Sequence, residues 1–304
     1  MRVQDFRLCR NALAQLYHNP FRVYGIITAE VIGAVIIELM RVERKCRMLA
    51  MMSPARNIRP ASFAGEESDY PLFPGKTKQL VDVLRGYSPW ELESLLEVNP
   101  EKALEIFVRY QQFDPALPGT PALLAYYGAA FRNLNVQDFH REDFSFAREH
   151  LRILSALYGL LRPADGILPY RLGMQCDFTI NGQDLYTFWG DRIYEELFRK
   201  GEPVINLASM EYAKLVTPYL TPADTLITCR FLIQKPGGGT RATVSTVRTA
   251  RGQMVRYLIK NRITAPEGLK DFDWAGYRFI GNLSADLTYV FVQDPNYAQR
   301  VGTG

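Results

Sequence analysis

The sequence predicts a mixed α/β (α+β) fold, in which a central mixed sheet is surrounded by helices. Segments with apolar residues at helical spacing alternate along the chain with short apolar runs typical of buried strands. The chain has 304 residues, of which 47% are hydrophobic and 22% charged, enough for a sizeable core. We expect residues 48–304 to form a single domain and residues 1–47 to form an N-terminal extension.

The extension contains the most apolar stretch of the chain, "GIITAEVIGAVIIELM" at 25–40. Glu30 and Glu38 interrupt it, and it is shorter than the roughly 20 residues that span a bilayer. It also begins too late for a signal peptide and lacks a small-residue cleavage site. We therefore expect an additional helix or an upstream segment here, and no membrane partner. The extension carries the whole net charge of +4, because the remaining chain is formally neutral.

The first half of the domain is predicted to begin with a buried strand in "MLAMMSPARN" (48–57), which ends in a Ser-Pro turn. Residues 59–75 are rich in Pro, Gly and Ser and indicate a loop. The segment 77–113 then predicts successive helices, in which Gly86 ends the first, Ser88 caps the second and Asn99 caps the third.

This succession has the outline of a helix–hairpin–helix. The backbone N–H groups of its hairpin, Gly86, Tyr87 and Ser88, would be offered to phosphate. The second helix is acidic, since it carries Glu91, Glu93 and Glu97, and this favours the alternative of an ordinary packed pair of helices.

The second half of the domain alternates helices and strands. We expect helices at 144–161, 185–198 (capped by Asp184) and 251–262, strands at 203–209 and 287–293, and a β-hairpin of 225–234 with 240–249.

Cysteine and histidine spacing argues against a metal or redox site. The four cysteines are widely spaced and form no C-x-x-C motif, and the three histidines show no metal-ligand spacing. We therefore expect no cofactor and no metal. Reduced thiols indicate a cytoplasmic location.

Residues 225–266 contain no acidic residue but eight basic ones. On the predicted helix 251–262, Arg256 and Lys260 lie opposite the apolar face, where they meet either solvent or an anion. Arg251 and Arg262 lie on the apolar side at the two ends. Arg251 also stands beside Gly252 at the predicted start of the helix, where exposed N–H groups suit phosphate oxygens.

"NLASMEY" (206–212) follows a predicted strand, which is a usual place for α/β active sites. Ser209, Glu211 and the more distant Asp191 are the catalytic candidates, with the two carboxylates as acid and base on a nucleobase or nucleotide. The alternative is that these carboxylates form structural salt bridges. No Walker loop, GxGxxG or catalytic triad stands out, so an enzyme is the less favoured class.

Several of these segments match long motifs of a known family. The motifs are "SPAR" (53–56), "LSALYGLLRPADGILPYRLGM" (154–174), "LYTFWGDRI" (185–193), "NLASMEY" (206–212), "TARGQMVRYLIKNRIT" (249–264) and "FDWAGYRF" (272–279). Through them, the chain resembles the peroxide stress protein YaaA family of bacteria over about residues 48–293. The resemblance implies a cytoplasmic protein of the hydrogen peroxide response that supports DNA repair. It also implies binding of duplex, bubbled or branched DNA through a basic cleft and a helix–hairpin–helix.

The chain departs from the family pattern at four places. Arg56 replaces a lysine, Gly173 replaces a glutamate, Arg248–Thr249 replaces two lysines, and Tyr127–Gly128–Ala129 replaces Lys-Gly-Asp. These changes weaken the expectation of a shared catalytic arrangement more than that of general phosphate contact. The residues that we expect to contact phosphate are Arg56, Arg162, Arg171, Arg248, Arg251, Arg256 and Lys260.

Overall fold

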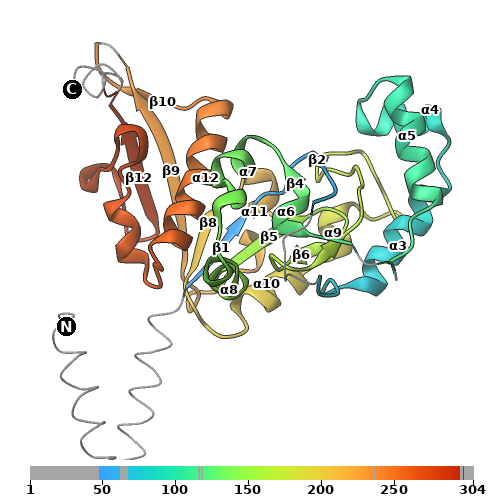
Figure 1. The fold of residues 1–304 in the computed structure, drawn as a ribbon, viewed down its shortest axis with the longest axis horizontal. Helices are drawn as coiled ribbons and strands as arrows, with labels where there is room; N and C mark the ends of the chain where they lie inside the picture. Colours follow the sequence, from blue (N-terminus) through green and yellow to red (C-terminus); the bar gives the residue numbers. More distant parts are fainter. Residues whose placement is uncertain are drawn as a thin grey trace, which may run out of the picture. The chain divides into compact units, whose positions relative to one another are not determined.

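The computed structural model describes residues 48–61, 68–115, 117, 119–235, 237–294 and 297, so the boundary expected after residue 47 stays a prediction. An eight-stranded mixed sheet forms the centre, which confirms the predicted fold class (Figure 1). Its main path runs β11 (Tyr277–Phe279), β12 (Thr288–Gln293), β9 (Leu226–Gln234), β8 (Val204–Leu207), β1 (Leu49–Met52), β5 (Leu151–Ser155) and β6 (Gly159–Leu161). β10 (Thr240–Arg241) pairs with β9 off this path.

The inner strands β12, β9, β8, β1 and β5 pair in parallel, and the edge strands β11 and β6 pair antiparallel. β1 and β8 are buried along their whole length, as expected for parallel strands that are covered on both faces. Because parallel strands point the same way, the segments that follow β1, β5, β8 and β9 leave the sheet at one edge, which we call the carboxyl edge. Two small sheets pair β2 (Asn57–Ile58) with β4 (Tyr126–Tyr127) and β3 (Thr120–Pro121) with β7 (Gly166–Ile167).

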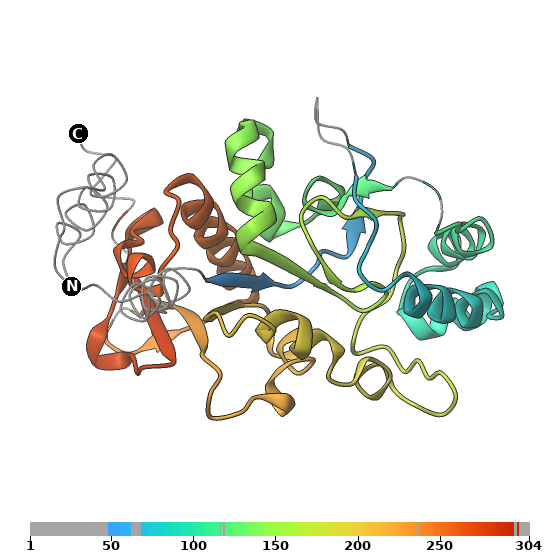
Figure 2. The same cartoon turned by 90° about the horizontal axis from the view of Figure 1, so that it is seen from below.

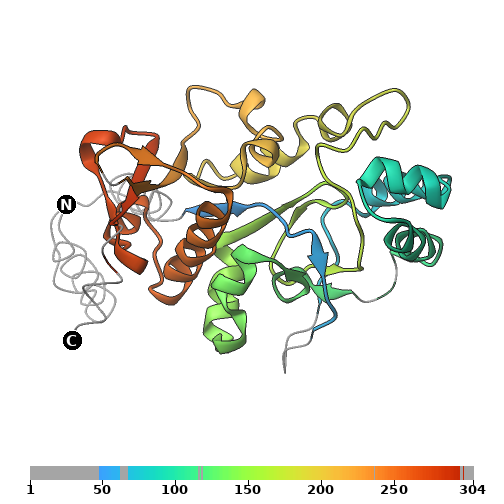
Figure 3. The same ribbon diagram turned by 90° about the horizontal axis from the view of Figure 1, so that it is seen from above.

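Helices cover both faces of the sheet. α8 and α12 lie on one face, and α10 and α11 lie on the other (Figures 2 and 3). The helices are α3 (Pro74–Arg85), α4 (Pro89–Leu96), α5 (Pro100–Gln111), α6 (Ala122–Ala125), α7 (Ala129–Leu134), α8 (Arg141–His150), α9 (Leu185–Trp189), α10 (Arg192–Phe198), α11 (Met210–Ala213) and α12 (Val244–Lys260). Short 3-10 helices occur at Val136–Asp138, Thr217–Tyr219, Pro266–Asp271, Trp274–Gly276 and Gly281–Leu283.

The prediction of one helix over 144–161 is wrong. Helix α8 ends at His150, and the chain continues directly into β5, which pairs with β1. The apolar run has helical spacing, but a central strand that is buried on both faces is also continuously apolar, so periodicity does not separate the two. Pairing in the sheet decides the outcome.

Two other predicted elements have different bounds. The helix expected over 185–198 is divided into α9 and α10 at Gly190, whose φ of +57° lies in the left-handed region that favours glycine. The second strand expected at 240–249 is only β10, because Thr243 caps α12 by accepting a hydrogen bond from the Thr246 N–H. Helix α12 therefore begins seven residues earlier than expected, at Val244 instead of 251.

Helices α3, α4 and α5 confirm the helices predicted within 77–113, and they project from the end of the molecule beyond β6 (Figure 1). The predicted caps are also confirmed. Ser88 and Glu91 form a capping box, and the Asn99 side chain accepts a hydrogen bond from the Lys102 N–H.

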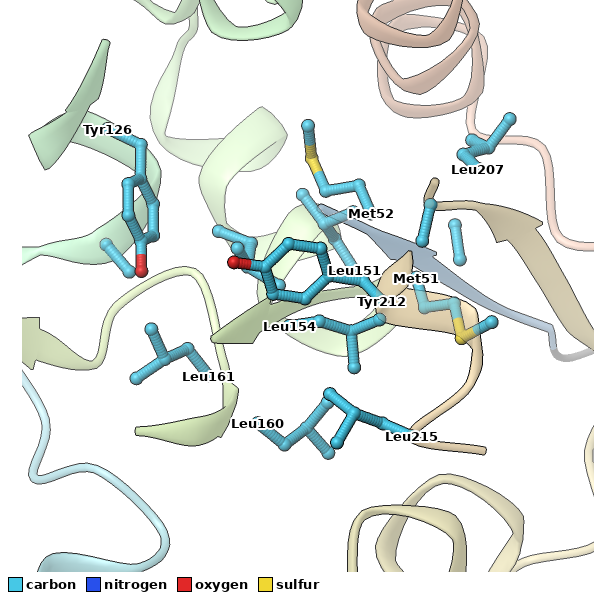
Figure 4. Close-up of a cluster of buried hydrophobic side chains, with 14 of the residues drawn as sticks. Met51, Met52, Tyr126, Leu151, Leu154, Leu160, Leu161, Leu207, Tyr212 and Leu215 are labelled. Atoms are coloured by element: carbon cyan, nitrogen blue, oxygen red, sulfur yellow. The ribbon is translucent and has the colours of Figure 1, made fainter. Parts of the chain in front are cut away.

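The core is continuous through the sheet. Figure 4 shows Met51 of β1, Leu154 of β5 and Leu160 of β6 in one apolar cluster, and all three side chains are fully buried. Burial of each such side chain contributes roughly 1.5–3 kcal/mol to stability. Tyr126 and Tyr212 also belong to this cluster.

Candidate functional site

Two serines join the carboxyl ends of β1 and β8. Ser53 Oγ donates a hydrogen bond to Ser209 Oγ (3.2 Å) and accepts one from the Ser209 N–H (2.8 Å). Asn206 is buried at the end of β8, where its side chain hydrogen-bonds to Thr228 and to the Ala208 N–H. The predicted candidate Ser209 therefore lies at the carboxyl edge, as the position after a strand indicated.

Arg56 and Arg171 lie together after the carboxyl end of β1. The Arg171 guanidinium donates to the Arg56 carbonyl oxygen (3.3 Å), and the two positive charges lie close enough that Arg56 lowers the pKa of Arg171, although burial lowers it more. The backbone of Arg171 is fixed by Tyr110, whose hydroxyl donates to the Arg171 carbonyl (2.6 Å). Arg56 is exposed, and Arg171 is half-buried.

Glu211, at the start of α11, lies near Arg56. Burial raises the pKa of its carboxyl group, while Arg56, the backbone N–H groups of Gln175 and Met174, and Arg248 oppose that rise. The Tyr186 hydroxyl donates to the Glu211 carbonyl (3.0 Å) and fixes the backbone at this position.

Arg248 and Arg251 approach from α12. Arg248 is exposed and acts electrostatically on both Glu211 and Arg251. Arg251 is half-buried, its Nε is fully buried without a hydrogen-bond partner, and its pKa is lowered mainly by burial. Because α12 begins at Val244, the Arg251 N–H lies inside the helix, so the predicted helix start at Arg251 is wrong, and contact of Arg251 with phosphate stays a prediction. Arg251 can therefore contact an anion through its side chain but not through its backbone N–H.

We call Arg56, Arg171, Arg248 and Arg251 the arginine cluster. In the part of the chain that the structure describes, none of the four makes an ion pair with a carboxylate within 4.0 Å. They come from segments more than 190 residues apart in the sequence, between 56 and 251. The cluster is therefore a concentration of positive charge that only the tertiary fold creates, and Glu211 lies near Arg56 and Arg248 without forming an ion pair with them.

The other three basic residues expected at phosphate are paired with acids. Arg256 makes a bidentate ion pair with Asp138 (2.7 and 2.6 Å), and Lys260 pairs with Asp143 (2.8 Å). Arg162 pairs with Asp165, which is completely buried (2.7 Å). The run 225–266 contains no acid, but the 3-10 helix Val136–Asp138 and helix α8 supply Asp138 and Asp143 to its basic residues. A structural role accounts for these three charges, and their contact with phosphate stays a prediction.

The backbone N–H groups of the hairpin are all engaged within the protein. The Gly86 N–H donates to Val83, the Tyr87 N–H to Leu84, and the Ser88 N–H to the Glu91 carboxylate (2.7 Å). Phosphate binding by this hairpin stays a prediction, and this geometry does not favour it.

Asp191 is exposed at the start of α10, and it is not among the largest influences on the pKa of Glu211. The acid–base pair of Asp191 and Glu211 stays a prediction.

Three residues that sequence patterns did not single out lie around the arginine cluster. Cys176 lies near Arg171, Arg56 and Glu211, and burial raises the pKa of its thiol. Arg59 stacks on the Tyr127 ring at 3.4 Å, and Arg132 lies 5.7 Å from the same ring. Arg59 could have been identified from the sequence, because it lies three residues after Arg56. Arg132 becomes a neighbour only through the pairing of β2 with β4.

The described residues contain no group of three or more His, Cys, Asp or Glu side chains that could hold a metal ion. No helix among them is long and apolar enough to cross a bilayer.

The fold and the site together define a mixed α/β protein with a cationic cluster at the carboxyl edge of a largely parallel sheet. The sequence model described as peroxide stress protein YaaA matches residues 48–283. A UPF0246 protein of Clostridioides difficile is 34% identical over 248 residues, which cover 81% of this chain and all of that protein. Others are 38% identical in Limosilactobacillus reuteri (80% of this chain, 98% of that protein) and 37% identical in Acaryochloris marina (81% and 100%). The chain belongs to the peroxide stress protein YaaA family.

Proposed function

We propose that this protein binds DNA in the cytoplasm during the peroxide stress response, supports DNA protection and repair, and contacts phosphates through the arginine cluster. Membership of a peroxide stress family supports the physiological setting. The observation that carries the DNA contact is the convergence of four arginines without acidic partners at one edge of the sheet. Guanidinium groups bind phosphate oxygens in a bidentate way, and uncompensated ones bind them most readily.

The fully buried, unpartnered Nε of Arg251 strengthens this argument. A buried donor without a partner costs about 1–3 kcal/mol, so such a group persists where a ligand can approach the same side chain. Arg59 and Arg132 add positive charge around the partly exposed Tyr127, whose ring is already covered on one face by the Arg59 guanidinium.

The test is fluorescence anisotropy with duplex, bubbled and branched DNA over a series of salt concentrations. We expect affinity to fall linearly with the logarithm of the salt concentration, because bound phosphates release counterions. Arg248→Ala should weaken binding to every DNA and reduce the slope by about one. Arg248 is chosen because it is exposed and makes no hydrogen bond among the described residues, so its loss should leave the fold intact.

The matched control is Arg199→Ala, which removes the same charge from an exposed residue that pairs with Glu196 on α10. It should leave both affinity and slope unchanged. Equal effects of the two substitutions would show that only net charge matters. Absence of salt-dependent binding by the unmodified protein would refute the proposal.

A second candidate is an enzyme that acts on a nucleobase or nucleotide at the same cluster. The observation that favours it is the position of Ser209 and Glu211 at the carboxyl edge, where α/β enzymes carry their catalytic groups. The test is release of base or phosphate from nucleotides and from DNA, with Glu211→Gln as the inactive control. No release above that of the variant would exclude it.

A further inference from the structure

Glu211 is an acidic residue within a group of arginines, and the proposed DNA contact gives it no role. The Glu211 carbonyl accepts a hydrogen bond from the Tyr186 hydroxyl (3.0 Å), which fixes the backbone, and the backbone of Met174 and Gln175 lies near enough to the carboxyl group to lower its pKa against the effect of burial. The side chain is half-buried, so its position is fixed better than that of a surface carboxylate. Such a group has a defined direction from which a ligand can reach it.

The carboxylate keeps unused hydrogen-bonding capacity. An ionised carboxylate offers about four lone-pair sites and no donor. No cation of the described residues lies within 4.0 Å of the Glu211 carboxylate to use this capacity. Arg56 and Arg248 are near enough to act on its pKa but do not pair with it. The arginines thus remain available to an anion, and the carboxylate remains available to N–H donors.

A ligand that satisfies both requirements carries phosphate and a pair of N–H donors. Among the common nucleobases, only guanine presents two neighbouring donors, N1–H and the N2 amino group, to the two oxygens of one carboxylate. Adenine and cytosine place an acceptor beside their amino group, and the N3–H of thymine lies between two carbonyl oxygens, which a carboxylate repels. The guanine donors lie on the Watson–Crick edge, so the base must be unpaired.

We propose that Glu211 and the arginine cluster together recognise a guanine nucleotide with a free Watson–Crick edge, in which the arginines bind phosphate and Glu211 accepts hydrogen bonds from N1–H and N2–H. The inference rests on the proposed function for the source of the nucleotide, since unpaired guanine occurs in bubbled and branched DNA. A free guanosine monophosphate has the same chemistry, and the experiment separates the two sources.

The experiment measures anisotropy with labelled duplexes that carry one unpaired nucleotide at the centre. The unpaired base is guanine, hypoxanthine, adenine, cytosine or thymine in otherwise identical sequence. Hypoxanthine keeps N1–H and lacks the 2-amino group, so it tests the second hydrogen bond without any change in the protein. We expect the guanine probe to bind about tenfold or more tightly than the thymine probe, with hypoxanthine between them.

Glu211→Gln should bind all five probes with similar affinity and keep the salt slope of the unmodified protein. The amide has nearly the same shape, but only one acceptor oxygen remains. Thermal unfolding checks that this variant is folded. If the variant does not fold, the comparison of the guanine probe with the hypoxanthine probe on the unmodified protein still tests the proposal.

Two results would overturn the inference while leaving the proposed DNA contact intact. One is salt-dependent binding without preference for guanine. The other is tighter binding of every probe by Glu211→Gln to the same extent, since the carboxylate would then only repel phosphate. A protein that binds no DNA contradicts the proposed function itself. In that case, guanosine monophosphate should raise the melting temperature more than inosine monophosphate does, and an equal effect of the two would overturn the recognition of guanine as well.

Discussion

At the scale of single residues, acids from distant segments decide which basic side chains remain free. Asp138 and Asp143 compensate Arg256 and Lys260, whereas Arg248 and Arg251 on the same helix α12 have no such partner. The two halves of α12 therefore have different roles. Its C-terminal half is joined by ion pairs to the segment 136–143, and its N-terminal half carries the guanidinium groups of the arginine cluster.

Asp143 provides a prediction about pH. Burial alone would raise its pKa, but hydrogen bonds from Lys260, from the His140 N–H and from Arg262 lower it to about 2. Because the pKa in the folded protein lies below the ordinary value of 3.8, folding favours the ionised form. The contribution of ionised Asp143 to the free energy of unfolding is present above pH 4 and is lost as the pH falls towards 2.

We therefore expect Asp143→Asn to lower the free energy of unfolding by about 1–2 kcal/mol at pH 7. This range is smaller than the pKa shift alone would give, because Lys260 and Arg262 are partly exposed and solvent screens their charges. Urea unfolding from pH 7 to pH 2 should show the difference from the unmodified protein shrinking at the acid end. Asp82→Asn, which breaks the exposed pair with Lys78, is the control and should change stability little. A difference that stays constant with pH would show that the carboxylate is not the cause.

At the scale of elements, the close approach of α7 and α12 depends on one glycine. A Cβ atom on Gly252 would lie 2.0 Å from the Ala130 carbonyl oxygen of α7, and backbone atoms cannot give way as a flexible side chain would. Gly252 thus allows α7 and α12 to pack closely, and this packing fixes the position of the neighbouring Arg251.

We expect Gly252→Ala to lower the free energy of unfolding by about 1–3 kcal/mol, although alanine favours helices more than glycine does. Gly75→Ala in α3 is the matched control, because no atom lies within 4 Å of the added Cβ. The control should be neutral or slightly stabilising in thermal unfolding. If both variants lose stability equally, the packing argument for Gly252 fails.

The hairpin between α3 and α4 gives a prediction that separates stability from DNA binding. Ser88→Ala removes the side-chain acceptor of the capping box and should cost about 1 kcal/mol. Because the hairpin N–H groups are engaged internally, we expect DNA affinity and its salt slope to stay unchanged in anisotropy measurements. Weaker binding of all DNA probes by this variant would instead assign the hairpin to the DNA contact.

At the scale of the whole molecule, local features were predictable from sequence and long-range ones were not. Helix caps such as Ser88 and Asn99 lie within three residues of the groups they bond, so the local sequence is enough to predict them. The pairing of Arg256 with Asp138 spans 118 residues and leaves no local sign. The strand at Leu151–Ser155 was mistaken for helix because only its pairing with β1 distinguishes it.

In the candidate site, too, local features were predictable from the sequence and long-range ones were not. Position after a strand located Ser209 and Glu211 correctly at the carboxyl edge, and turns near strand ends located Arg56 and Arg171. The same reasoning also selected Arg162, because a turn position alone does not reveal that the buried Asp165 three residues later neutralises it. Charge compensation is a property of the folded chain, and the sequence shows only the charges.

The hydrogen bond between Ser53 and Ser209 closes a loop of 156 residues, and this has a consequence for the order of folding. Contacts of such sequence separation require a large loss of chain entropy before they form, so they are expected late. The arginine cluster cannot assemble before that closure. An anion that binds it will therefore recognise only the completed native state, and by mass action it will stabilise the entire domain rather than the edge that it touches.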